Sequence, residues 1–427
     1  MLEALLAVIG GCVLGMITGL VPGLHPNTIA SIFFIVVITS TCGGDDFVAL
    51  WILSTSIVHT FVNIIPSVLL GAPEGDTALA VLPGHKLLLE GRGMEAIELS
   101  AMGSICSLFV SFALIPFFAI FLFYFYDDIR PHLWMIITGI VAVMIITEFG
   151  GLKKRLYSLI VILLSGYLGM LAFNNEPLMT PLFSTLQYLH VSTPLIPLLS
   201  GLFGASTLVV SLATGCSSLP PQRHDFQSPS ISRVKRGVIT GTFAGAFVSW
   251  IPGLSPSIGT VLAYIATSRK ELSNKAEDYI VAISGVNTSD AIFSLLTLWL
   301  IRKARSGTLI VIDELMPSSE WSLITIMGMM GVVILSSICG YYITIKAGGL
   351  LSSVLSEMDM RIISSGVIVL LASISFVFGG IFGLSLFLCA IPIGIFAILS
   401  GVRRSNAMGV VLVPVLVSYI KQSFLPV

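Results

Sequence analysis

The chain has 427 residues, of which 56% are hydrophobic and 10% charged, and its formal net charge is −1. Soluble globular proteins carry roughly 25% charged residues, so this composition excludes an ordinary soluble domain and predicts an all-α polytopic membrane protein. The near-neutral charge gives no sign of nucleic-acid binding, and we expect no nucleic-acid partner. The six cysteines show no CxxC or Cys/His spacing, so neither a disulfide framework nor a metal site is predicted.

Apolar segments recur along the whole chain, which begins without the basic start and cleavage site of a secretory signal. In chain order they cover residues 2–21, 28–42, 47–71, 96–125, 132–147, 156–173, 194–214, 237–251, 257–267, 279–301, 321–345, 362–379, 381–400 and 407–420. The segments 28–42 and 257–267 are too short to span alone and follow proline-rich breaks, so each is expected to form a hairpin, re-entrant or fully crossing, with the segment before it. We therefore predict about 10–12 transmembrane helices in the cell (cytoplasmic) membrane.

Charged loops give a partial orientation. The stretch 151–157 and the stretch from Arg223 to Arg236 are basic, whereas the loop between the segments 156–173 and 194–214 has no lysine or arginine. By the positive-inside rule, the two basic stretches face the cytoplasm. Beyond Arg302 the charge cues conflict, so the side of the N-terminus stays open.

The most informative feature is an internal duplication. The sequence Pro22-Gly23-Leu24-His25-Pro26-Asn27 aligns with Pro252-Gly253-Leu254-Ser255-Pro256-Ser257 without a gap. The offset that carries Pro22 onto Pro252 also carries Gly11 onto Gly241 and Gly15 onto Gly245, and these glycine spacings predict close helix packing. We infer two homologous transmembrane repeats, residues 1–215 and 216–427. With the segments counted as above, the two repeats are parallel; if one helix is divided differently, they are inverted. We favour the inverted form because it is common in secondary transporters.

The repeated breaks suggest a binding site. Irregular backbone survives in hydrocarbon only where it is buried in protein or lines a wet cavity. Each break removes two amide donors at its prolines and permits a tight turn at its glycine. Asn27 and Ser257 are then placed to cap the half-helix that follows. The free N–H groups and the positive dipole end of that half-helix favour an anion, so both breaks, Pro22–Asn27 and Pro252–Ser257, are predicted to bind substrate. The alternative is that each break only kinks a packed helix, and its repetition at one register favours the site.

Polar residues inside apolar segments add a second set of candidates. Asn63 in the first half and Asn287 in the second are predicted to contact substrate. Asp290, with Thr288 and Ser289, is predicted to couple transport to Na⁺ or H⁺, because an ionisable group within a span is a functional candidate; the alternative for Asp290 is a capping residue near an interface. No other cofactor is expected. We also expect a second helix interruption over residues 285–290, and an interfacial Glu148 beside Lys153.

These stretches resemble the membrane subunit family of the tripartite tricarboxylate transporters, the TctA family. The resemblance lies in "GMITGLVPGLHPN", "GAPEGDTALAVLPGHKLLLEGRG", "WIPGLSPSIGTVLAY" and "ISGVNTSDA". It implies uptake of citrate-like carboxylates driven by an ion gradient, together with a small membrane subunit and an extracytoplasmic solute-binding protein. It assigns the substrate cradle to Pro22–Asn27, Pro252–Ser257 and Asn287. His25 and Ser255 stand where the family usually has glycine.

The leading hypothesis is therefore a secondary active transporter of a small organic anion, a di- or tricarboxylate, with alternating access around the paired half-helices. The second hypothesis is a lipid-phosphate (polyprenyl phosphate) translocase, since a mid-membrane anion cradle also suits a phosphate headgroup. An intramembrane enzyme is not expected. The chain has no HExxH or GxGD, and its nearest approach to a GxSG motif is Gly253-Leu254-Ser255-Pro256.

Overall fold

The computed structural model of the chain is built from helices. It describes residues 2–21, 30, 44–72, 77–148, 150–182, 194–214, 231–251, 254, 256–267, 275–356 and 360–424, and these residues include no β-strand. Nine helical stretches within the described ranges are long and apolar enough to cross a membrane, and two shorter apolar helices lie at 78–89 and 256–266. The prediction of an all-α polytopic membrane protein is confirmed.

The first half contributes the following α-helices: α1 (Leu2–Leu20), α3 (Asp45–Val62), α4 (Ile64–Leu69), α5 (Val81–Leu89), α6 (Gly93–Ile129), α7 (Leu133–Ile146), α8 (Gly151–Asn174), α10 (Leu195–Leu199) and α11 (Ser206–Thr214). The second half contributes α12 (Ile231–Val248), α13 (Pro256–Thr267), α14 (Lys275–Ile301), α15 (Gly307–Leu315), α16 (Leu323–Ser356), α17 (Met360–Leu399) and α18 (Gly409–Phe424). Short 3₁₀ turns lie at η1 (Ala78–Ala80), η2 (Arg130–His132), η3 (Glu176–Leu178), η5 (Ser318–Glu320) and η6 (Arg404–Met408), and η4 (Ser200–Ala205) is a π-helical segment.

The predicted apolar segments in the described ranges coincide with helices, but α5 and α15 had no predicted segment and α16 extends to Ser356, beyond the predicted end at residue 345. The boundary predicted between 362–379 and 381–400 falls on a kink inside α17, where Gly380 has φ +60°. A side chain at Gly380 would be strained at this φ and would also meet the backbone of Thr180. Glycine is therefore required where the chain turns between the two halves of α17.

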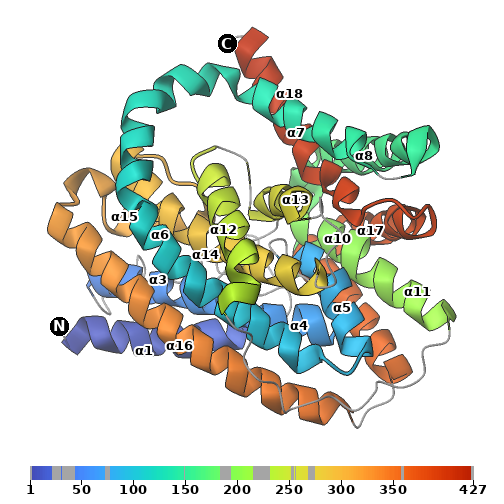
Figure 1. The fold of residues 1–427 in the computed structure, drawn as a ribbon, viewed down its shortest axis with the longest axis horizontal. Coiled ribbons are helices and arrows are strands. Elements are labelled where there is room, and N and C mark those ends of the chain that lie inside the picture. The colour runs from blue at the N-terminus through green and yellow to red at the C-terminus, as the bar shows by residue number, and fades with distance from the viewer. Residues whose placement is uncertain are drawn as a thin grey trace.

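Six of the helices form two groups of three, and the helices within each group are parallel. In one group are α1, α3 and α16: Gly11 and Gly19 of α1 face Ser54 and Val62 of α3, and α16 packs along α3 in the same sense. In the other group are α12, α14 and α6, and Figure 1 shows α6 and α16 crossing the molecule in opposite directions. The contact of Ile97, near the start of α6, with Gly348, near the end of α16, agrees with that view. The two groups are therefore antiparallel to one another.

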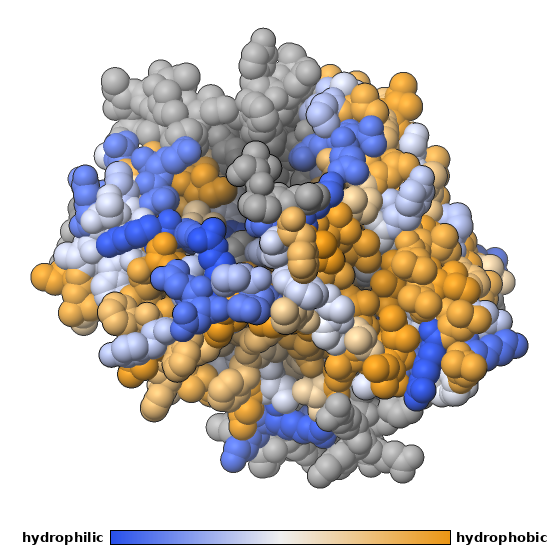
Figure 2. Space-filling view, turned by 90° about the horizontal axis from the view of Figure 1, so that it is seen from above, coloured by the Kyte–Doolittle hydropathy of each residue, from blue (hydrophilic) through white to orange (hydrophobic). Residues whose placement is uncertain are grey.

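The centre of the molecule is formed by α14 and the α3–α4 pair. In these spans 89% and 78% of the most apolar window is buried, against 28% in the stretch that contains α6 and α7. On α6 large apolar side chains are exposed, among them Phe117 and Phe123. Figure 2 shows hydrophobic residues in broad areas of the surface with hydrophilic residues in smaller patches. This distribution suits helices whose outer faces meet lipid.

The predicted close packing at the glycines is confirmed. A Cβ on Gly15 would lie 2.7 Å from the Thr55 carbonyl oxygen, and one on Gly245 would lie 2.5 Å from the Val286 carbonyl oxygen. Only glycine allows α1 to approach α3, and α12 to approach α14, this closely.

The expected interruption of the helix over residues 285–290 is wrong, because α14 is continuous from Lys275 to Ile301. The hydroxyl of Ser289 donates to the Gly285 carbonyl at 2.7 Å, so this polar side chain is satisfied inside a regular helix. Gly285 serves packing instead: a Cβ there would lie 2.5 Å from the Ser107 hydroxyl oxygen on α6.

Candidate functional site

The second proline-rich break lies between α12 and α13. Pro252, Gly253 and Ser255 fall outside the described residues, but the residues around them are placed: Trp250, Ile251 and Leu254 are buried, and Pro256 and Ser257 form the first turn of α13. Ser257 is also buried. Helix α13 therefore begins in the interior of the protein, as the sequence predicts for a half-helix.

The depth of this N-terminus follows from the register of α13 against α14. The rings of Tyr264 and Tyr279 have centroids 4.8 Å apart, and a Cβ on Gly259 would lie 2.7 Å from Val286 Cγ1. The two helices are thus antiparallel, and the start of α13 falls about one turn beyond Val286. Pro256 is therefore level with residues 287–290 of α14, near the middle of that 27-residue helix.

One face of α14 borders the break. Ile283, Asn287, Asp290 and Ser294 follow the i, i+4, i+7, i+11 spacing that places side chains on one side of a helix. Asn287 is buried, and its Oδ1 has no hydrogen-bond partner among the described residues. The Ser294 hydroxyl lies 3.5 Å from Asp290 Oδ1 and 3.4 Å from the Ser249 carbonyl oxygen. Asn287 and Asp290 thus lie on one face of α14, level with the start of α13, and Ser294 links Asp290 to the end of α12.

The other two residues predicted for ion coupling lie on different faces of α14. Ser289 faces α12, where its hydroxyl is 3.5 Å from the Gly241 carbonyl oxygen. Thr288 continues the row of Ser284 and Gly285 that packs against α6, and its buried hydroxyl has no partner within the described part of the chain. Asp290 is therefore not grouped with Thr288 and Ser289. Within the described ranges no three His, Cys, Asp or Glu side chains come together as a metal site.

Arg305 caps the C-terminus of α12, where the break begins. Its Nε donates to the Ser249 carbonyl at 2.9 Å and its Nη2 to the Val248 carbonyl at 3.4 Å, which satisfies the C-terminus of α12. Burial lowers the pKa of Arg305 to about 10, and the negative charge of Asp290 acts in the opposite direction. The sequence did not single out this residue, because an arginine just after a span is also typical of an interfacial anchor.

The first break, Pro22-Gly23-Leu24-His25-Pro26-Asn27, lies outside the described residues, but the helix that leads into it is placed. A Cβ on Gly19 would lie 3.2 Å from the backbone nitrogen of Asn63, which is buried at the junction of α3 and α4. One turn before Asn63, Nδ1 of the buried His59 lies 3.1 Å from Oγ1 of Thr18, the residue before Gly19. Asn63 therefore lies beside the end of α1, where the first break begins.

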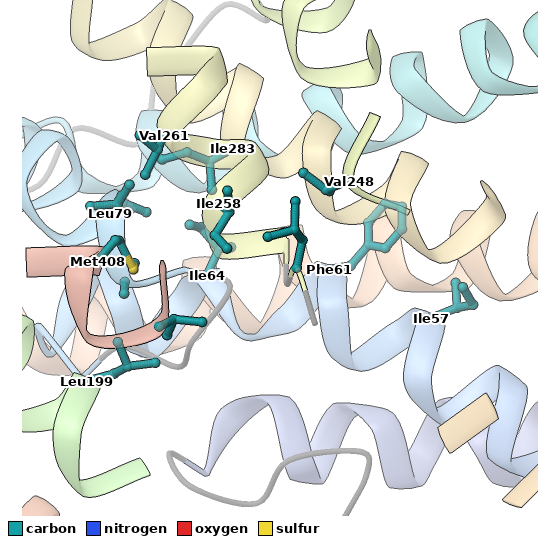
Figure 3. Packing of buried hydrophobic residues seen from close by; sticks show 14 of the residues in the cluster. Ile57, Phe61, Ile64, Leu79, Leu199, Val248, Ile258, Val261, Ile283 and Met408 are labelled. Atoms are coloured by element: carbon teal, nitrogen blue, oxygen red, sulfur yellow. The ribbon is translucent and has the colours of Figure 1, made fainter. Parts of the chain in front are cut away.

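An apolar cluster holds α13 in place on its other side. Figure 3 shows Ile258 and Val261 of α13 among buried side chains that include Ile64, Leu79 and Met408. Helix α13 also packs directly on η1 and η6. The start of α13 thus sits where segments of both halves meet, and its orientation is fixed by packing.

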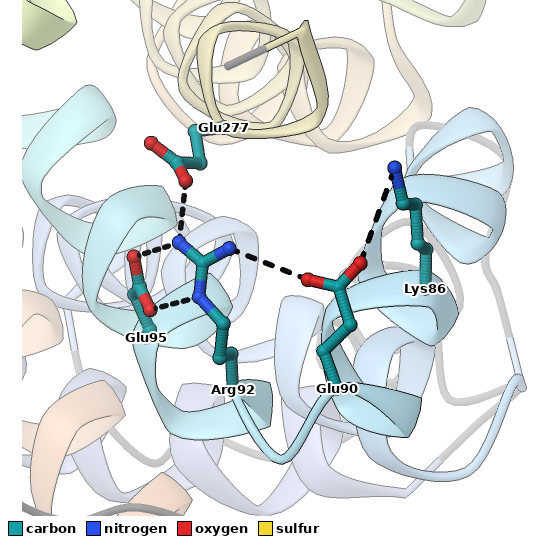
Figure 4. A network of polar contacts seen from close by, with 5 residues as sticks. All are labelled: Lys86, Glu90, Arg92, Glu95 and Glu277. Carbon is teal, nitrogen blue, oxygen red and sulfur yellow. Dashed lines mark hydrogen bonds and ion pairs between the residues drawn. The ribbon is translucent and has the colours of Figure 1, made fainter. Parts of the chain in front are cut away.

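A charged network joins the two halves at a distance from the break. Arg92, between α5 and α6, binds both oxygens of Glu95, at 2.6 and 2.5 Å, and also donates to Glu277 in the first turn of α14 (Figure 4). Glu90 accepts from Arg92 at 3.3 Å and lies 4.0 Å from the exposed Lys86. The hydrogen bond with Glu95 raises the pKa of Arg92, so the guanidinium stays charged.

A second network involves Glu148, which follows the span that ends at Ile146, as predicted. The residue is buried in protein, and its partner is Arg403, not Lys153: Arg403 Nε lies 3.2 Å from Glu148 Oε2. Asn406 Nδ2 donates to the same oxygen at 2.9 Å. The α7–α8 turn is therefore tied to η6, a long-range pairing that the local sequence around Glu148 does not reveal.

Comparison with known proteins identifies the family of the chain. The model of the Tripartite tricarboxylate transporter TctA family matches residues 5–409. The chain is 28% identical over 429 residues to the Uncharacterized protein MJ1079 of Methanocaldococcus jannaschii, an alignment that covers 98% of this chain and 99% of that relative. No solved structure matches the chain significantly. Since the family match spans nearly the whole sequence, the chain belongs to the tripartite tricarboxylate transporter TctA family.

Proposed function

We propose that the chain is a secondary active transporter of a small organic anion, a di- or tricarboxylate, coupled to H⁺ or Na⁺. Membership of the family makes it a component of a multi-subunit transport system and a multi-pass membrane protein. The substrate class, the coupling ion and the reaction cycle are our proposal, and they rest on the break between α12 and α13.

The observation that carries the proposal is the position of the α13 N-terminus, level with Asn287 and Asp290 in the interior. A helix N-terminus presents free N–H groups and a partial positive charge, which favour a carboxylate. The Asn287 amide is a neutral polar group that can add a hydrogen bond to the anion. Asp290, on the same face of α14, is the group that we propose takes up the coupling ion.

We further propose that the halves 1–215 and 216–427 are inverted repeats that move relative to each other. The helix bounds support this: α6 begins at Gly93 and α16 at Leu323, the same offset as that between Pro22 and Pro252, and the two helices run antiparallel. Gly150 and Gly380 are related by that offset too, and both have positive φ. Inverted repeats with broken helices at the repeat interface are a recurring basis of alternating access.

The partners follow from the family's tripartite organisation. We propose that the chain works with a small membrane subunit and an extracytoplasmic solute-binding protein. The exposed aromatic side chains of α6, such as Phe117 and Phe123, form an apolar surface of this chain. Such a surface suits contact with lipid, and we propose that the membrane subunit also binds there.

The test combines transport and binding. The purified chain is reconstituted in proteoliposomes loaded with unlabelled citrate, and entry of radiolabelled citrate is measured with and without Na⁺ or proton gradients. Because partner subunits can limit transport, the thermal stabilisation of the same protein by citrate is measured against chloride at equal ionic strength. We expect citrate-specific stabilisation and exchange, both weakened by Pro22→Ala or Pro252→Ala and unchanged by Pro414→Ala in α18. Absence of both signals over a panel of carboxylates contradicts the proposal, and stabilisation by a polyprenyl phosphate alone favours the lipid-phosphate translocase.

A further inference from the structure

Helix α14 ends on the side of the membrane opposite to the predicted cytoplasmic face. Helix α12 begins inside the basic stretch that runs to Arg236, and a Cβ on Gly237 would lie 2.5 Å from the carbonyl oxygen of Asp278, in the first turn of α14. Both helices therefore start on the side that the positive-inside rule makes cytoplasmic. Since a helix of 27 residues is about 40 Å long, α14 crosses the membrane and ends on the outer side.

Helices α12 and α13 form a hairpin that enters from the cytoplasmic side. Helix α12 runs along α14 as far as Ser249, whose carbonyl oxygen is 3.4 Å from the Ser294 hydroxyl, and α13 returns to the level of Tyr279, near the start of α14. At the turn between them, the Leu254 amide donates to the Ile251 carbonyl at 3.2 Å. The hairpin is therefore re-entrant, and its turn is directed toward the outer end of α14.

Three cations follow α14 directly, and we name Arg302, Lys303 and Arg305 the outer basic cluster. A basic run on the outer side departs from the positive-inside rule. No ion pair of the described residues includes a member of this cluster, and Asp290 is the one carboxylate whose charge acts on Arg305. Three positive charges thus face one negative charge, so the region attracts anions.

Two members of the cluster are directed into the protein rather than to the membrane surface. Lys303 is half-buried, and its Nζ lies 5.5 Å from the ring centroid of Tyr126, which is 5% exposed. Arg305 donates to the carbonyls of Val248 and Ser249. Basic residues that anchor a helix extend to the headgroup region instead. Anchoring therefore does not explain the orientation of Lys303 and Arg305.

The cluster lies beside the end of α12, where the break begins. Ser249, which Arg305 contacts, is three residues from Pro252 in the sequence, and three residues of extended chain span at most about 11 Å. The rings of Tyr126 and Trp250 have centroids 6.3 Å apart, and the buried Tyr126 hydroxyl has no hydrogen-bond partner among the described residues. A positive group and an unused donor thus lie next to the break on its outer side.

We infer that the outer basic cluster is the entrance through which the substrate anion reaches the break from the outer side. This inference rests on the proposed function, and it names the side of entry and the residues that the anion meets first. A positive potential at an entrance raises the local concentration of anions and speeds their association. The buried position of Tyr126 and the half-buried position of Lys303 favour a small anion over a protein surface.

The first experiment measures the charge preference of the entrance. Ala304→Cys, between Lys303 and Arg305, is introduced into the full-length chain without native cysteines, in right-side-out membrane vesicles. Two membrane-impermeant methanethiosulfonates are applied, one with a sulfonate and one with a trimethylammonium group. Relative to free cysteine, we expect the sulfonate reagent to react at least about tenfold faster, because the cluster attracts anions. The control Leu152→Cys, exposed at the start of α8 on the cytoplasmic side, is expected to stay unlabelled.

The second experiment measures how the cluster affects citrate binding. Thermal stabilisation of the full-length chain by citrate in nanodiscs is compared at low and at high ionic strength. Lys303→Gln is expected to weaken citrate binding about fivefold at low and less than about twofold at high ionic strength, because salt screens the charge. The matched control Lys86→Gln removes one positive charge on the cytoplasmic side, beside Glu90, and is expected to change binding less than about twofold at either ionic strength.

The outcomes separate the inference from the proposed function. Equal rates for the two reagents, labelling of Ala304→Cys only from the cytoplasmic side, or unchanged citrate binding in Lys303→Gln at low ionic strength overturns the inference and leaves the transport proposal standing. No binding of citrate or of any other carboxylate by the wild type overturns both. The labelling experiment keeps all three cations, so it decides even if Lys303→Gln does not fold. Stabilisation by polyglutamate rather than by citrate, lost in Lys303→Gln, identifies a docking surface for an acidic protein and contradicts the inference.

Discussion

The hydroxyl oxygens of Ser100 and Ser284 lie 2.6 Å apart and join α6 of the first half to α14 of the second. The hydroxyls of Ser54 and Ser336, 2.8 Å apart, join α3 to α16 in the same manner. Ser54 and Ser284 are related by the offset of the repeated breaks, the one that carries Pro22 onto Pro252. Each half therefore packs its long helix against the central helix of the other half, through small polar side chains.

The contact between α6 and α14 predicts a specific cross-link. In a variant without the native cysteines, Ser100→Cys/Ser284→Cys is expected to form a disulfide on mild oxidation, because the two side chains point at each other within bonding reach. The product is identified by mass spectrometry of digested protein. The control pair is Ser100→Cys/Ser336→Cys, whose members belong to different interfaces. Equal cross-linking of both pairs, or none of the first, contradicts the packing described here.

The glycine contacts predict opposite effects of one substitution at two positions. Gly245→Ala places a methyl group against the Val286 carbonyl and the Ser289 hydroxyl, and we expect a loss of about 1–3 kcal/mol of stability. Gly331→Ala on α16 meets no atom within 4 Å and is expected to be neutral or stabilising by up to about 1 kcal/mol. Thermal unfolding monitored by size-exclusion chromatography distinguishes them. If both variants melt together, the close approach of α12 and α14 is wrong.

The network around Arg92 predicts that two substitutions, each removing one positive charge, lower the stability by different amounts. Arg92→Gln removes the contacts that tie the α5–α6 turn to Glu277, and we expect a loss of about 1 kcal/mol. Lys86→Gln also removes one positive charge, but Lys86 is exposed and 4.0 Å from Glu90, so its loss is expected to stay below about 0.5 kcal/mol. Denaturation midpoints of the two variants provide the comparison. Equal midpoints would show that the network does not stabilise this fold.

The position of Asp290 predicts a separation of ion dependence from substrate binding. Asp290→Asn keeps the size of the side chain and its place on the face of α14, but removes the charge that faces Arg305. We expect citrate affinity to change less than the ion dependence, because the α13 N-terminus and Asn287 hold the anion whereas Asp290 takes up the coupling ion. The dependence of uptake on Na⁺ or pH is expected to disappear. Retention of the wild-type ion dependence excludes Asp290 from the coupling step.

Much of the fold could be predicted from the sequence, because long apolar runs indicate membrane helices, and glycine and proline indicate their breaks and close contacts. The kink at Gly380 and the start of α13 at Pro256 both coincide with such residues. The glycine spacings at 11/15 and 241/245 likewise identified two of the close helix contacts, although not those at Gly169 and Gly394.

Other features depend on partners that are distant in sequence. A run such as Gly285–Asp290 looks unfavourable for a helix, yet tertiary packing and the back-bonding hydroxyl of Ser289 keep it helical. Glu148 and Arg404 gain their meaning from residues in the other half of the chain, Arg403 and Leu202 respectively. Local pattern contains no information about such pairs, so the sequence could identify the breaks but not Arg305, which lies at the end of α12.

The most direct measurement is a cryo-EM structure of the full-length chain in saturating citrate. Bound citrate is expected beside the first turn of α13, within hydrogen-bonding distance of its backbone N–H groups and of Asn287. Density for citrate elsewhere in the molecule, or a first turn of α13 that is enclosed entirely by apolar side chains while citrate is bound, would contradict the assignment of the break as the substrate site.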